Sequence, residues 1–115
     1  MNWAENLYLS DKTAEKKERI IKKAQLGVGM VQVYLITLAS NEKNLLDIFH
    51  AAHLKQSAFY HQELNVVGIA KGLEDAQELT LQIIRDIYEQ TGGFDVRSYF
   101  VFPAGERKRR RKRAR

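Results

Sequence analysis

The amino-acid sequence predicts a single α+β domain built around one apolar strand. Residues 27–40 form the most apolar run of the chain, rich in β-branched and aromatic residues, with Gly at its start and Ser at its end. A run of this kind is typical of a strand that is covered on both faces. Two other observations support this prediction. Residues 73–91 have the regular period of a helix, and a length of 115 residues is that of one domain.

Residues 1–10 precede this domain as an N-terminal segment. Trp3 and Leu7 are four residues apart and would share one face if the segment were helical. We expect the aromatic side chains of the segment to dock on the domain. Exposed Trp and Tyr side chains are also typical anchors for a partner protein, so the segment could serve as a short binding motif.

A leading helix is predicted over residues 11–27, with Ser10 or Asp11 as its cap and Gly27 at its end. Its apolar stripe is narrow, which places the helix at the edge of the domain rather than in its centre. We interpret its Lys and Arg side chains as a solvated face.

The central strand presents apolar side chains on both sides, because successive residues of a strand point to opposite faces. The two sets are Val31, Val33 and Leu35 on one side, and Tyr34, Ile36 and Leu38 on the other. Both faces of the sheet must therefore be covered. Helices would cover one face, and either the leading helix or a partner would cover part of the other. A homodimer through the sheet is one hypothesis for such a partner.

Three elements are expected after the central strand. Apolar side chains grouped on one side predict a helix over roughly residues 42–54, with Ser40 and Asn41 as the signal for its start. Residues 57–62 have the aromatic content of a short strand, although no turn separates them from the next strand. Residues 65–70 are a clearer strand, in which Gly68 indicates the close approach of a neighbour.

The last two elements are the longest helix and a final strand. Residues 73–91 carry apolar side chains at the helical period, and Gly92 ends the helix. Residues 95–102 are expected to form a strand. Over residues 11–105 the order is then a leading helix followed by β-α-β-β-α-β, which is that of a ferredoxin-like sandwich. Without a strand at residues 57–62, the same chain makes a three-stranded β-α-β-α-β sheet.

Positive charge is concentrated at the C-terminal end of the chain. Residues 107–115 carry eight basic side chains, whereas residues 27–106 have a net charge of −5 and residues 1–26 a net charge of +2. Segments with so many like charges cannot form a core, so we expect residues 106–115 to be a disordered tail. Because the rest of the chain sums to a negative charge, this division indicates against a folded basic groove as a nucleic-acid surface.

A tail of this composition binds polyanions through phosphate contacts and counterion release, without recognition of base sequence. No apolar anchor accompanies it, so a membrane partner is not expected. The predicted nucleic-acid-binding residues are Arg107, Lys108, Arg109, Arg110, Arg111, Lys112, Arg113 and Arg115.

The chain shows no recognised catalytic arrangement and contains no cysteine. Its three histidines, His50, His53 and His61, are weak candidates for metal ligands, with Asp47 and Glu63 nearby in sequence. Their spacing departs from H-E-x-x-H, and ordinary surface histidines explain them better than a metal site does. We therefore expect no metal and no cofactor.

The resulting hypothesis is a small, non-enzymatic binding domain that its basic tail tethers to nucleic acid. The alternative is a dimeric module that senses a ligand or binds a protein partner, in which the tail is incidental. The apolar run from Leu26 to Ala39 has 14 residues, against about 20 needed to cross a bilayer, so we expect a cytoplasmic protein.

Overall fold

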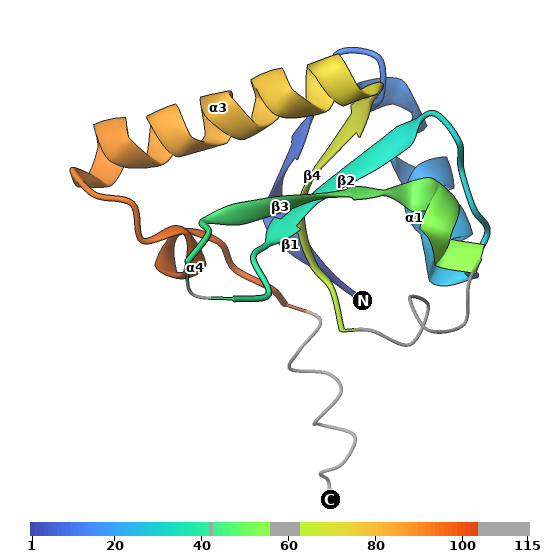
Figure 1. Cartoon of the computed structure of the whole chain (residues 1–115), viewed down its shortest axis with the longest axis horizontal. Coiled ribbons are helices and arrows are strands. Elements are labelled where there is room, and N and C mark those ends of the chain that lie inside the picture. The colour runs from blue at the N-terminus through green and yellow to red at the C-terminus, as the bar shows by residue number, and fades with distance from the viewer. Residues whose placement is uncertain (42, 56–62, 104–115) are drawn as a thin grey trace, which may run out of the picture.

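Four strands form one mixed sheet with the spatial order β1-β4-β2-β3 (Figure 1). The computed structural model describes residues 1–41, 43–55 and 63–103. The elements in chain order are β1 (Asn2–Leu9), the 3₁₀ turn η1 (Ala14–Lys16), α1 (Lys17–Gln25), β2 (Val33–Leu38), β3 (Leu46–His50), the 3₁₀ turn η2 (Ala51–Lys55), β4 (Asn65–Lys71), α3 (Leu73–Thr91) and α4 (Val96–Tyr99).

β4 lies between β1 and β2 and pairs with both. It is parallel to β1 and antiparallel to β2, and β2 is in turn antiparallel to β3. Leu35 stands opposite Ile69 on one side and Phe49 on the other, so the predicted central strand is central in the structure as well. The α+β prediction is confirmed, but the strand order differs from that of a ferredoxin-like sandwich.

The first difference is that residues 2–9 form the strand β1, although the aromatic side chains Trp3 and Tyr8 do pack on the rest of the domain as expected. Trp3, Leu7 and Leu9 pack on one face of the sheet, whereas Ala4 and Tyr8 pack on the other. This is the period of two that defines a strand. The four-residue spacing of Trp3 and Leu7 fits a strand as well as it fits a helix.

The second difference is that the helix predicted over residues 42–54 is wrong: β3 and η2 lie there instead. The helix-start signal at Ser40 and Asn41 has another use. The Asn41 side-chain oxygen accepts hydrogen bonds from the backbone N–H groups of Lys43 (2.9 Å) and Asn44 (3.1 Å), which closes a turn between β2 and β3.

The third difference is that residues 96–99 form the short helix α4, so the strand predicted over residues 95–102 is also wrong. Asp95 caps this helix, because its carboxylate accepts hydrogen bonds from the N–H (3.3 Å) and hydroxyl (2.7 Å) of Ser98. The strand proposed over residues 57–62 lies outside the described residues.

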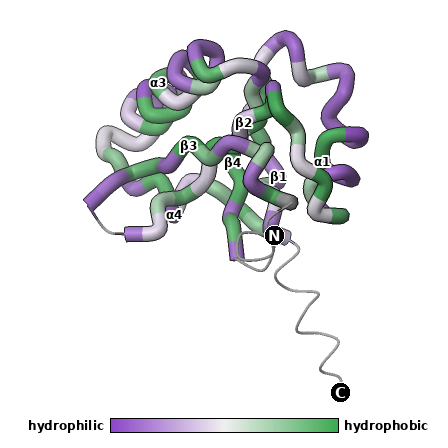
Figure 2. Tube along the Cα trace, turned by 45° about the vertical axis from the view of Figure 1, so that its right-hand side comes forward, coloured by the Kyte–Doolittle hydropathy of each residue, from purple (hydrophilic) through white to green (hydrophobic). Residues whose placement is uncertain are grey.

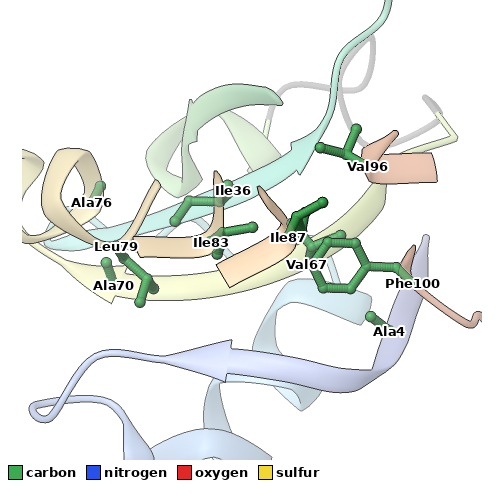
Figure 3. Close-up of a cluster of buried hydrophobic side chains, with 10 residues drawn as sticks. All are labelled: Ala4, Ile36, Val67, Ala70, Ala76, Leu79, Ile83, Ile87, Val96 and Phe100. Atoms are coloured by element: carbon green, nitrogen blue, oxygen red, sulfur yellow. The ribbon is translucent and has the colours of Figure 1, made fainter. Parts of the chain in front are cut away.

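The chain covers both faces of its own sheet. α3 and α4 cover one face, where α3 places Ala76, Leu79, Ile83 and Ile87 on the strands, as Figure 3 shows for the labelled side chains. α1 and η2 cover the other face through Ile20, Ala24, Ala51 and Leu54. α1 and α3 alternate hydrophobic and hydrophilic stretches along their length (Figure 2), as expected of helices with one buried side.

Two glycines behave as the sequence predicts. A Cβ at Gly68 would lie 3.1 Å from Cδ1 of Ile36 and 3.4 Å from Cδ2 of Leu79, so β4 and α3 approach closely there. Gly92 ends α3 in the left-handed conformation (φ +80°).

Thr13 hydrogen-bonds the turn that precedes η1 to strand β4. Its side chain is buried, and its hydroxyl lies 3.0 Å from the carbonyl oxygen of Ser10 and 3.1 Å from that of Ile69 in β4. The backbone N–H of Ser10 donates to the same Ile69 carbonyl (3.0 Å). Because a buried hydroxyl needs a partner, this contact fixes where the chain leaves β1 and enters η1.

Tyr8 joins three elements on the opposite face. Its hydroxyl, on β1, donates to Asp86 of α3 (2.9 Å) and lies 3.4 Å from the hydroxyl of Tyr99 on α4. Burial, followed by these hydrogen bonds and the Asp86 charge, raises the pKa of the Tyr8 phenol well above its ordinary value.

We predict that Thr13→Val lowers the free energy of unfolding by about 1–2 kcal/mol, because the hydroxyl hydrogen bond is lost inside the protein. Thr80→Val is the matched control, since the Thr80 hydroxyl bonds only to the Ala76 carbonyl (2.8 Å) within its own helix. Urea unfolding of the two variants measures the difference. Equal losses would contradict a tertiary role for Thr13.

We also predict a pH-dependent effect of Tyr8→Phe. The folded pKa of Tyr8 is raised, so the stability that its neutral phenol provides is fully present below about pH 10, its unfolded pKa, and declines as the pH rises beyond that value. The difference in unfolding free energy between the wild type and Tyr8→Phe should therefore narrow above about pH 10. Urea unfolding across that range tests this, and a constant difference would refute it.

Candidate anion-binding groove

A groove of about 430 Å³ lies between α1 and the segment that leads into β2, and the end of β4 contributes to it. Its charged lining is entirely basic. Five cationic side chains line it, namely Lys12, Lys16, Arg19, Lys23 and Lys71. Ile20, Met30 and Val33 supply apolar lining between them. Groups of this kind attract anions, because several positive charges around one hollow add their fields.

Four of the five cations come from one stretch of sequence. Lys12, Lys16, Arg19 and Lys23 follow each other at intervals of four, three and four residues. Lys12 lies in the turn before η1, Lys16 ends η1, and Arg19 and Lys23 lie on α1. The spacing from Lys16 to Lys23 keeps side chains on one side of a helix. Ile20 and Ala24 of the same helix are buried against the sheet, so α1 is held by its apolar side while the cations border the groove.

The fifth cation comes from a different element. Lys71 is the last residue of β4 and stands opposite Val33 at the start of β2. The adjoining residue Gly72 has a positive φ of +89°, and its N–H donates to the Gln32 carbonyl (2.8 Å). This bond ties the end of β4 to the groove segment. It also means that this amide is already used and does not face a ligand.

One groove cation has an acidic partner within the described residues. Lys12 lies 3.9 Å from the Asp75 carboxylate, and its side chain is 66% exposed, so the pair is weak. A neighbouring hollow of about 290 Å³ is lined by Asp11, Asp75 and Glu78 as well as by Lys12. The basic groove therefore ends at an acidic surface on the side of α3.

The summed charge indicated against a folded basic groove as a nucleic-acid surface, yet the folded body does contain a groove with a basic lining. Net charge summed over segments hides the groove, because Glu15 and Glu18 offset the cations of α1 in the sum. The signal that could have found it is the interval pattern from Lys12 to Lys23. Lys71 could not have been assigned to the same surface without the sheet, because it lies 48 positions after Lys23 in the sequence.

The histidines do not assemble a metal site in the part of the chain that the structure describes. His50 and His53 have ring centroids 5.8 Å apart, but His50 stacks on Tyr34 (4.4 Å) and its Nε2 lies 2.6 Å from the Val31 carbonyl oxygen. No group of three His, Asp or Glu side chains in residues 1–41, 43–55 and 63–103 is placed to hold a metal ion. His61 lies outside those residues.

The tail residues from Arg107 to Arg115 likewise fall outside the described residues, so the structure does not place them. Within the described ranges, no helix is long and apolar enough to cross a membrane.

Comparison with models of protein families, with curated proteins and with solved structures found no match to this chain. The groove and the tail are therefore interpreted from their own chemistry.

Proposed function

We propose that this protein is a small, non-enzymatic domain that binds nucleic acid through the phosphate backbone, with the basic C-terminal residues as the tether. The observation that carries the proposal is the concentration of charge: residues 107–115 hold eight cations, while residues 27–106 have a net charge of −5. A polyanion is attracted to the first segment and repelled by most of the second. Contact would therefore be confined to a defined part of the molecule.

The proposed binding mode is independent of base sequence. Lys and Arg side chains that contact phosphates release condensed counterions, and this release supplies the free energy of non-specific binding. The tail contains no aromatic residue that could stack on bases, since residues 107–115 are Arg, Lys and one Ala. Affinity should thus depend steeply on salt and little on the sequence of the nucleic acid.

We predict that replacing the eight basic residues of 107–115 by glutamine in the full-length chain removes most of the salt-dependent binding. The slope of log K against log salt should fall by up to about 7, because each lost phosphate contact removes about 0.7–0.9. Fluorescence anisotropy of a labelled oligonucleotide at several salt concentrations measures this slope.

The control is a tail in which each Arg is exchanged for Lys and each Lys for Arg, which keeps the charge. It should retain the slope of the wild type. Undiminished binding by the glutamine variant would refute the tether, and an absence of binding by the wild type would refute the proposed function itself.

A further inference from the structure

We infer that the groove beside α1 is a second, folded contact site that holds several consecutive phosphates of a nucleic-acid strand. This inference rests on the proposed function and adds to it, because it assigns binding to described residues of the domain. Five cations line the groove, and its lining includes no acidic side chain.

The length of the cationic row favours an extended ligand over a single phosphate. Lys16 and Lys23 are seven residues apart, which corresponds to about 10 Å along a helix. One strand of a nucleic acid carries a charge about every 3.4 Å of axis, so about three phosphates fit along this row. The Gly72 amide, which could have helped to enclose a single anion, is bound to Gln32.

The chemistry of the lining favours contact with the backbone rather than with bases. None of the residues that line the groove is aromatic, so the groove offers no surface on which a base could stack. Arg19 and the lysines donate to phosphate oxygens from flexible stems. Gln32 is the one lining side chain with an amide, which is insufficient to distinguish bases along a strand.

The charges around the groove favour one path for a bound nucleic-acid strand. Asp11, Asp75 and Glu78 line the adjoining hollow and would repel phosphates from the α3 side. The strand would therefore run along α1, past Lys16, Arg19 and Lys23, rather than across α3.

A lipid surface is the competing partner that the test must separate. The loop after α1 exposes Leu26 (66%), Val28 (42%) and Val31 (75%), and apolar side chains beside cations also suit an anionic bilayer. The shape of the groove favours a nucleic-acid strand over a bilayer. Cations that line a hollow can surround a narrow polyanion, but they cannot all reach a flat surface.

The experiment compares two full-length triple variants with the same loss of charge. The groove variant is Lys16→Gln, Arg19→Gln and Lys23→Gln. The control variant is Lys22→Gln, Lys43→Gln and Arg85→Gln, which alters exposed side chains that do not line the groove. All six substituted side chains are exposed, so neither variant removes core packing.

The groove variant should lower the slope of log K against log salt by about 2–3 for a labelled oligonucleotide, and the control variant should leave it nearly unchanged. In the wild type, added oligonucleotide should shift the amide NMR signals of residues 12–33 and Lys71, while those of Asn41, Lys43 and Asn44 stay in place.

Equal effects of the two triple variants would overturn the inference, because only net charge would then matter. A groove variant with the full slope, beside a glutamine tail variant that no longer binds, would overturn the groove and leave the tether intact. If the groove variant loses binding to vesicles of phosphatidylserine but keeps its oligonucleotide affinity, the site is a lipid site and the inference fails.

Discussion

The pairing of β4 on both of its edges organises the molecule. β4 bonds to β1 on one side and β2 on the other, and every residue from Val66 to Ala70 is buried. A strand in this position must be apolar on both faces, and each face then needs its own cover. α3 covers one face and α1 the other, so the place of α1, and with it the groove, follows from the burial of β4.

The same pairing brings the groove together. Lys71 lies at the end of β4, and Val33 opposite it begins β2, so the sheet register sets this cation beside the segment that leads out of α1. Thr13 fixes the other side, because its hydroxyl contacts the Ile69 carbonyl two residues before Lys71. Cations distant in sequence thus line one hollow through contacts that are themselves part of the fold.

Sequence patterns predicted the elements whose signals are long or unambiguous. The helical period of residues 73–91 and the apolar run that contains β2 fall in this class, as do Gly68 and Gly92. Short segments were missed because their local signals fit two structures. The Asn41 side chain closes a turn instead of starting a helix, and Asp95 caps a helix of four residues where a strand was expected. The spacing of Trp3 and Leu7 fits both a helix and a strand, and pairing with β4 decides for the strand.

For the groove, the spacing of Lys16, Arg19 and Lys23 was visible in the sequence. The contribution of Lys71 was not, because it depends on strand pairing.

A row of cations on an exposed helix often serves only to solvate it, so positive charge alone does not identify the groove as a binding site. The helix itself offers a comparison. Glu15 and Glu18 stand four residues before Arg19 and Lys22, which is the order that stabilises a helix in isolation. Stability alone would favour acidic side chains among the lining positions of the groove as well, since like charges around one hollow repel. The groove lining instead holds five cations and no acidic side chain, and the one ion pair that a groove cation makes within the described residues is the weak contact of Lys12 with Asp75. Like charges around one hollow cost electrostatic energy in the free protein, and a bound anion would relieve that cost. The proposal of a phosphate backbone as this anion follows from the match between its charge spacing and the length of the row.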